Sequence, residues 1–302
     1  SEKLVKGCPL TAKEIVDIIG EKGIVGLGGA TFPSKVKLCP PPGNKAEILI
    51  INAVECEPYL TNDHALMLAK PEQIVEGVAI LMKAINVSKA VIGIENNKPD
   101  AIATLSRVAS GYLGIEVQPL KVRYPQGGEK QLIDAIIRRQ VASGALPIST
   151  GAVVQNVATA YAVYEAVQKN KPLVERVMTV TGKSLKNPGN FLVRLGTPVA
   201  NLIEAAGGLP EDSGKVILGG PMMGRAAVSL SSPVGKGTSG VLIIPESEAT
   251  RKKEEPCIRC AKCVSACPMG LEPYLLAKVS SLNMLDSCLL YTSPSPRDRS
   301  LS

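Results

Sequence analysis

Short apolar runs alternate with segments of helical periodicity across residues 11–169, and this alternation limits the possible folds more than any other feature of the chain. The runs AEILIINAV from Ala46, KAVIGIE from Lys89 and GIEVQPLKV from Gly114 are typical of buried parallel strands. Helical segments flank them at residues 11–20, 71–86, 99–110, 129–139 and 156–169. The order predicts an α/β domain over residues 1–170, with a mainly parallel sheet covered by helices.

The pattern of predicted elements changes after Pro172. Short strand-like runs (RVMTVTG, FLVRLG, KVILGG and VLIIP) are separated by Gly/Pro turns, with one short helix expected near residues 198–206. We expect a small α+β domain over residues 171–247, followed by a cysteine-rich segment over 248–286. Residues 287–302 are rich in Ser, Pro and Arg and lack periodicity, so we expect an artefactual or disordered tail.

Composition excludes several classes of function. Net charge is +7, which favours anionic partners such as nucleotides, acidic proteins or lipid headgroups. Basic residues are scattered, and two Phe, seven Tyr and no Trp offer little for base stacking, so we expect no nucleic-acid partner. We also expect no transmembrane helix and no export signal, since the chain has no apolar run of about 20 residues and no signal-peptide pattern at its start.

Four of the eight cysteines are concentrated in eleven residues. Cys257, Cys260, Cys263 and Cys267, followed by Pro268, form C-x2-C-x2-C-x3-C-P. Thiolates at successive three-residue steps can wrap around one [4Fe–4S] cubane, and the fourth cysteine of such a run ligates the other cluster of a two-cluster ferredoxin. Structural zinc, the alternative, usually takes two C-x2-C pairs with a long spacer, which is absent here. The spacing therefore predicts iron–sulfur chemistry, with the partner motif missing from this chain.

A second candidate site is the glycine-rich run GLGGATFP at residues 26–33. The Rossmann fingerprint fails because Thr31 occupies the third glycine position, and the phosphate loop of NTPases fails because no G-K-[S/T] follows. A loop remains whose backbone N–H groups can approach a phosphate or a flat ring without Cβ obstruction, and a plain turn is the alternative.

Four segments carry a family resemblance in their order along the chain. GLGGATFPSKVK, NAVECEPYLTNDH (52–64), YPQGGEKQL (124–132) and VQNVAT (154–159) resemble the flavin-site segments of the NADH-oxidising subunit of respiratory complex I and, more closely, those of the C subunit of bacterial Rnf complexes. The region at 171–247 resembles an SLBB (soluble-ligand-binding β-grasp) domain, and the cysteine run resembles a truncated helical ferredoxin segment. The resemblance also implies an N-terminal domain, which we expect to lie outside the sequence given.

The resemblance implies roles for thirteen residues. Four would line FMN and one would lie near its polar edge: Gly26, Gly28, Gly29, Ala30 and Lys37. Three would contact the isoalloxazine or the stacked nicotinamide: Asn52, Glu55 and Glu57. Three would form the opposite wall: Tyr124, Gly127 and Glu129. Two would hold the phosphate end: Asn156 and Thr159. The chain departs from complex I at Val54 and Gly128, where that family has acidic residues, and it lacks most of the aromatics that sandwich the nicotinamide.

The implied function is electron transfer between NAD(H), FMN and 4Fe–4S clusters, two of them in the full-length family pattern, within a membrane-bound ferredoxin:NAD⁺ oxidoreductase that pumps ions. Other Rnf subunits would be the partners, and the chain would sit peripherally on the cytoplasmic face of the bacterial inner membrane. Two alternatives share the layout: a cobalamin reductase of the propanediol-utilisation type, and a non-catalytic relay or docking subunit that carries clusters but binds no nicotinamide.

Overall fold

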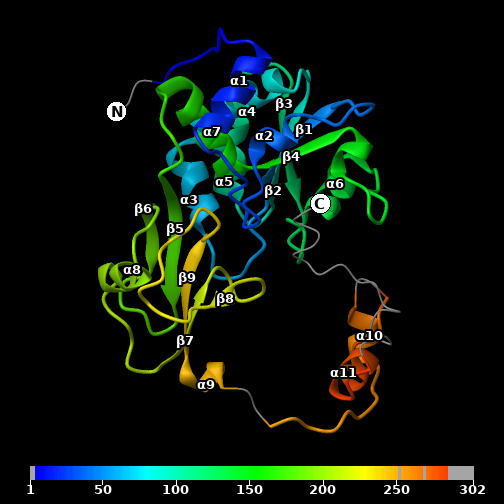
Figure 1. Ribbon diagram of the computed structural model, residues 1–302, viewed down its shortest axis with the longest axis vertical. Coiled ribbons are helices and arrows are strands. Elements are labelled where there is room, and N and C mark those ends of the chain that lie inside the picture. Colours follow the sequence, from blue (N-terminus) through cyan, green and yellow to red (C-terminus); the bar gives the residue numbers. More distant parts are fainter. Residues whose placement is uncertain (1–3, 251–252, 268–269, 285–302) are drawn as a thin grey trace.

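Two sheets form the body of the protein (Figure 1). The computed structural model describes residues 4–250, 253–267 and 270–284. The predicted tail at 287–302, and Cys288 within it, lie outside these residues. The first sheet and its helices end at Lys169, and the second sheet begins at Glu175. The domain boundaries proposed from sequence stay predictions.

The first sheet is parallel and has four strands in the order β3-β2-β1-β4. Its strands are β1 (Ile48–Ala53), β2 (Ala90–Glu95), β3 (Ile115–Leu120) and β4 (Ala152–Asn156). Helices α1 (Ala12–Glu21), α4 (Pro71–Ala84), α5 (Pro99–Ala109) and α7 (Val157–Lys169) pack on one face and α6 (Glu129–Ile137) on the other. Both faces of β1 are buried, which explains its unbroken apolar run.

Three short elements complete this part: α2 (Ser34–Lys37), α3 (Asn62–Ala69) and the 3-10 turn η1 (Pro147–Thr150). The predicted α/β class with a parallel sheet is confirmed. Sequence patterns missed α3 and β4, both of which contribute to the candidate site. The N-terminal end of α3 buries Asn62 and Asp63 among polar partners, so apolar periodicity does not reveal it.

The second sheet is mixed, with strand order β6-β5-β9-β7-β8. Its strands are β5 (Glu175–Gly182), β6 (Gly189–Arg194), β7 (Ser213–Leu218), β8 (Arg225–Ala226) and β9 (Gly240–Pro245). The short helix α8 (Val199–Ala205) contributes Val199, Leu202 and Ile203 to a separate apolar core. The helix predicted at 198–206 and the four predicted strands are all present.

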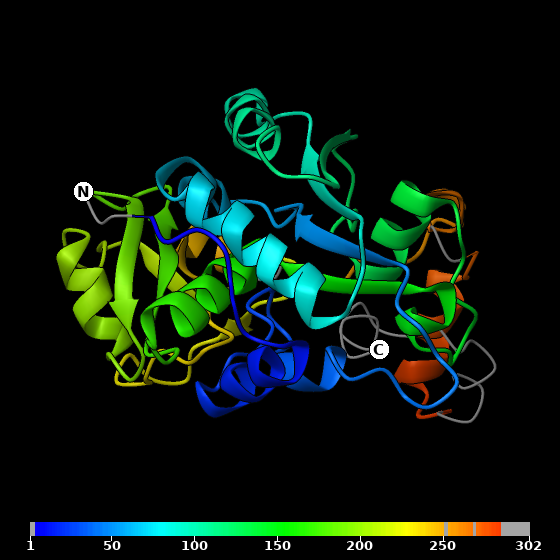
Figure 2. The same ribbon diagram turned by 90° about the horizontal axis from the view of Figure 1, so that it is seen from above.

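The cysteine-bearing segment lies apart from both sheets (Figure 1). After α9 (Glu246–Ala249), it contains α10 (Lys262–Ala266) and α11 (Pro273–Ser281), which pack against each other. Nowhere in the described residues is there a helix long and apolar enough to cross a membrane. Figure 2 shows α10 and α11, in orange and red, at one end of the molecule.

Candidate functional site

A cavity opens at the carboxyl ends of β1 and β4. All four strands are parallel, but β2 lies on one side of β1 and β4 on the other, so the strand order reverses at β1. Such a switch point leaves a crevice where ligands bind in open α/β sheets. Asn52 and Asn156 are direct partners in the strand register at this point. The cavity has a volume of about 640 Å³, which suits a cofactor-sized ligand.

The glycine-rich loop, residues 26–32, forms one wall of the cavity. Its base is fixed, since Gly26 N donates to Phe32 O and Leu27 N donates to Thr159 Oγ1 at 3.0 Å. Within the described residues, the backbone N–H groups of 28–32 have no hydrogen-bond acceptor. A Cβ added at Gly28 would project toward the Asn156 amide, with 3.6 Å to Nδ2. The loop therefore offers several free donors and a cradle that a side chain would fill.

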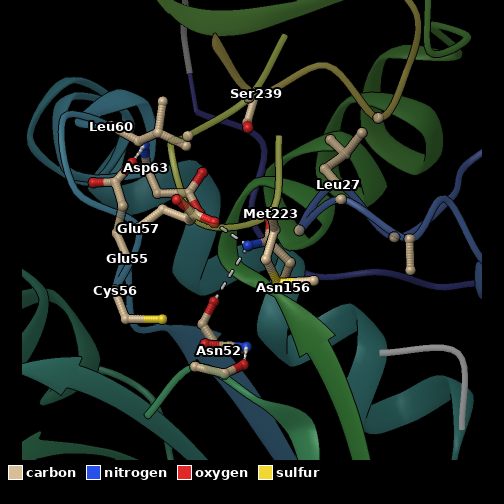
Figure 3. A pocket seen from close by; sticks show the side chains of 18 of the residues that line it. Leu27, Asn52, Glu55, Cys56, Glu57, Leu60, Asp63, Asn156, Met223 and Ser239 are labelled. Atoms are coloured by element: carbon tan, nitrogen blue, oxygen red, sulfur yellow. Dashed lines mark hydrogen bonds between the residues drawn. The ribbon is translucent and has the colours of Figure 1, made fainter. Parts of the chain in front are cut away.

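Acidic groups lie on the side of β1 and α3 (Figure 3). Asp63 accepts from Asn156 Nδ2 at 2.9 Å and from Asn62 Nδ2 at 3.0 Å. The Glu55 carboxylate accepts from the backbone N–H groups of Asp63 and His64, at 2.9 and 3.2 Å, and so caps the start of α3. Burial and the neighbouring Asp63 raise the pKa of Glu55 to about 7. Burial likewise raises the pKa of Asp63 and of Glu57.

The opposite wall comes from the loop 124–129 and the start of α6. Asn52 Nδ2 donates to Gly127 O at 2.8 Å and holds this loop over the end of β1. Lys37 Nζ lies 2.6 Å from Glu129 Oε1, and the Glu129 side chain is 7% exposed. Burial raises the pKa of Glu129, while the Lys37 ammonium opposes the rise. Burial also raises the pKa of Tyr124 to about 12.

The second sheet closes the cavity. Segments 218–225 and 237–239 line it, and Figure 3 shows Met223 and Ser239 facing the same space as Glu57 and Asn156. Met222 N donates to Glu57 Oε2 at 3.2 Å, which joins the two sheets across the cavity. Gly220 permits this contact, because a Cβ there would lie 2.1 Å from Glu57 Oε2.

Several buried polar atoms of the lining have no partner in the described part of the chain. They are three acceptors and one donor: Glu57 Oε1, Asn62 Oδ1, Glu129 Oε2 and Gln155 Nε2. A buried polar atom without a partner costs free energy, so such atoms around a cavity indicate a ligand that supplies the missing hydrogen bonds. A flat heteroaromatic ring with N–H and C=O groups along its edge could bond to these three acceptors and this one donor. A phosphate joined to the ring could accept from the N–H groups of the loop.

The structure brings twelve of the thirteen predicted residues into the lining of this one cavity. Thr159 is the exception: it is fully buried, and its hydroxyl accepts from Leu27 N and donates to Val25 O at 3.2 Å, which supports the loop from behind. Sequence reasoning missed Cys56 and Asp63, and it missed the whole contribution of the second sheet. Asp63 could have been suspected, since it lies in the acidic segment 52–64.

The four clustered cysteines are placed as free thiols on the surface of α10 and its flanking loops. Cys257, Cys260 and Cys263 are exposed and Cys267 is half-buried. Among the described residues, no three His, Cys, Asp or Glu side chains are gathered around a common metal position. The donor chemistry and spacing fit iron, but the thiols are not assembled around a cluster here.

Two family models match the chain. Residues 19–165 match the model described as "Nuo51 FMN-binding domain", and residues 177–226 match the model of the SLBB domain. Fold and site therefore define a protein with a Nuo51-type FMN-binding domain followed by an SLBB domain. Curated relatives show to which family of such proteins the chain belongs.

Relatives from several bacteria are C subunits of one kind of complex. The chain is 48% identical over 89% of its length to the C subunit of the proton-translocating ferredoxin:NAD(+) oxidoreductase complex of Clostridium ljungdahlii. It is 45% identical over 92% of its length to the C subunit of the Na(+)-translocating ferredoxin:NAD(+) oxidoreductase complex of Acetobacterium woodii, and 42% identical over 87% to the C subunit of the ion-translocating oxidoreductase complex of Rhodobacter capsulatus. The chain belongs to this family of Rnf-type C subunits. It spans 58%, 63% and 51% of the length of these relatives.

Solved structures show the same fold. An NAD⁺-reducing [NiFe]-hydrogenase in its H2-reduced state superimposes with a TM-score of 0.66 over 77% of this chain and 46% of the hydrogenase chain, at 24% identity. The air-oxidized state gives a TM-score of 0.64 over 78% of this chain and 47% of that one. At this identity the likeness concerns the fold alone.

Proposed function

We propose that this chain is the flavin-bearing part of an electron-transfer subunit in an ion-translocating ferredoxin:NAD⁺ oxidoreductase complex. The observation that carries the proposal is the cavity at the β1/β4 switch point. It is lined both by a loop whose N–H groups at 28–32 have no acceptor in the described residues and by buried polar atoms without partners there. The family relationship supports the same conclusion, since the relatives' names describe subunits of such complexes.

Residues of both sheets would hold FMN in this cavity. The N–H groups of the glycine-rich loop would receive the phosphate or the ring edge, and Gly28 leaves room for close approach. Glu57, Glu129 and Gln155 would supply the acceptors and the donor along the ring. Bound FMN would supply the step from two-electron hydride chemistry to one-electron transfer.

The chain's own groups would orient the reactants and set the polarity of the site. Asn52 and Asn156 fix the floor through bonds to Gly127 O and to Asp63. The second-sheet turn at 219–224 would exclude water from the side opposite the first sheet. NAD(H) would be the exchanged substrate, approaching the open part of the cavity, and no side chain of the lining needs to transfer a proton in a hydride step.

The cysteine cluster would hold iron and sulfide. Cys257, Cys260 and Cys263 would ligate one [4Fe–4S] cluster, and Cys267 would serve the second cluster of the full-length family pattern. Electrons leaving the flavin site would then pass to this segment. We place the subunit peripherally at the cytoplasmic face of the inner membrane, in contact with other subunits of the complex.

Anaerobic titration of the FMN-reconstituted chain with NADH tests the proposal. We expect flavin absorbance near 450 nm to bleach as NADH is added and to recover on addition of a one-electron acceptor. Bound flavin that does not bleach would favour a non-catalytic relay subunit. A chain that binds no flavin would contradict the proposal.

A Gly-to-Ala substitution outside the cavity provides a control for any substitution in the glycine-rich loop that is tested for flavin binding. Gly189 in β6 has room for a methyl group, since an added Cβ would meet its nearest neighbour, Phe191, at 3.7 Å. The G189A variant should therefore bind FMN and bleach like the unmodified chain. Loss of binding in this variant would show that binding does not report on the cavity.

A further inference from the structure

We propose that Arg176, on β5 of the second sheet, is a positioning residue that fixes the glycine-rich loop of the first domain in its ligand-binding conformation. The proposal assigns the SLBB domain a direct part in building the flavin site. It rests on the proposed function, because FMN is the ligand that the loop would bind.

The contacts of the Arg176 guanidinium cross from one sheet to the other. Its side chain is buried, with the residue 4% exposed. Nη2 donates to Leu27 O at 3.2 Å, and Nη1 donates to Lys236 O in the loop that precedes β9. One planar group therefore holds carbonyls from both domains, an arrangement that the rigid fork of an arginine allows and a lysine cannot reproduce.

Leu27 is held on both sides of its own backbone. Its carbonyl accepts from Arg176, and its N–H donates to Thr159 Oγ1 at 3.0 Å. The next peptide groups, at 28–32, are the ones whose N–H groups have no acceptor in the described structure. Fixing both the N–H and the carbonyl of Leu27 therefore restrains the conformation of residues 28–32, which line the cavity.

Other contacts bring the same two loops together. Lys236 Nζ donates to Gly23 O at 2.6 Å. A Cβ added at Gly237 would lie 3.0 Å from Gly29 O, so the two loops are packed backbone to backbone. Arg176 therefore lies at the buried, polar part of the contact between the glycine-rich loop and the loop that precedes β9.

Charge balance requires Arg176 in its protonated form. Asp63 of α3 is itself buried, and its negative charge favours the protonated form of Arg176. Lys98 also acts on Asp63, but its Nζ lies 2.8 Å from Glu95 Oε2. Burial lowers the pKa of Arg176 to about 10, with Asp63 opposing the shift, so the guanidinium stays charged at neutral pH. Removing it would leave Asp63 buried with its charge poorly compensated.

The experiment measures the dissociation constant of FMN for the full chain and its variants by flavin fluorescence. The hydrogen bond from Arg176 to Leu27 O is buried and its donor is charged, so we expect R176M to weaken FMN binding by about 10- to 100-fold. R176K keeps the charge but reaches one carbonyl at most, so it should lie between R176M and the unmodified chain.

A destabilised control distinguishes positioning from general loss of stability. Ile203 is buried in the second-sheet core around α8, away from the cavity lining, and I203A should lower the melting temperature without changing FMN affinity. If I203A weakens FMN binding as much as R176M does, or if folded R176M binds FMN within threefold of the unmodified chain, the proposal is wrong.

A second measurement needs no flavin. Amide exchange at Leu27, whose N–H bonds to Thr159, should accelerate in R176M and not in I203A when no FMN is present. An unmodified chain that fails to bind FMN would overturn the proposed function alone, while unchanged exchange at Leu27 in R176M would overturn the positioning role. If R176M does not fold, R176K provides both readouts.

Discussion

Lys37 and Glu129 form an ion pair at the edge of the cavity, with 2.6 Å between Nζ and Oε1. Lys37 comes from the short helix α2 and Glu129 from the first turn of α6, so the pair joins segments 92 residues apart in the sequence. The second oxygen of Glu129 has no partner in the described part of the chain. The pair therefore both supports the cavity and presents an acceptor to it.

Replacing Lys37 by Met should destabilise the chain in a pH-dependent way. Glu129 would remain buried without its cation, and we expect a loss of about 2 kcal/mol at pH 8, below the ~3–5 kcal/mol of a fully buried pair because Lys37 is partly exposed. The loss should shrink toward pH 5, where Glu129 takes up a proton. Urea unfolding at both pH values measures it, and K37M/E129Q should recover part of the loss. Equal losses at both pH values would contradict this account.

Gly28 should be replaceable without loss of the fold but not without loss of flavin. Its φ is not in the left-handed region, and an added Cβ has ordinary contacts, 3.6 Å or more from Asn156. The methyl group would fill the gap between the loop and Asn156 and narrow the cavity that both residues line. We expect G28A to keep the melting temperature within about 2 °C, since a strain-free Gly-to-Ala change alters stability by under ~1 kcal/mol, and to bind FMN at least tenfold more weakly in fluorescence titration.

Most helices and strands of residues 12–139, with the exception of α3, could be predicted because the apolar pattern that decides their burial lies within each element. The Ile and Leu residues of β1 and the amphipathic faces of α1 and α5 carry the period of their own structure. The strand β4 was missed because five residues ending in Gln155 and Asn156 give a short pattern that only pairing with β1 makes a strand. Arg176 was missed for a similar reason: its burial depends on a loop 149 residues earlier in the chain, which no local period reports.

Glu55 should make stability fall as pH rises through the neutral range. Its pKa lies at about 7 against an ordinary value of 4.5, so between these values the native state holds a proton that the unfolded state has released. The free energy of unfolding therefore decreases across this window, by about 3 kcal/mol from this group. E55Q should flatten the decrease while lowering stability overall, because Gln can accept only one of the N–H groups of Asp63 and His64.

Urea unfolding at several pH values between 5 and 8 checks the Glu55 prediction. E116Q provides the control, since the Glu116 side chain on β3 is 65% exposed. It should keep the slope of the unmodified chain. If the slope of E55Q equals that of E116Q, then Glu55 does not titrate in this window.

Of the four clustered cysteines, three should be needed to hold the iron of one cluster, and the fourth, Cys267, should not. After anaerobic reconstitution with iron and sulfide, the unmodified chain should contain about four iron atoms and absorb near 400 nm. C260S should lose both signals, and C39S, which replaces an exposed cysteine outside the cluster, should lose neither. C267S should retain most of the iron, because the fourth cysteine of this spacing serves another cluster. FMN binding should be equal in all four proteins, since none of these cysteines lines the cavity. Zinc in place of iron, or equal loss of iron in C260S and C267S, would contradict the assignment.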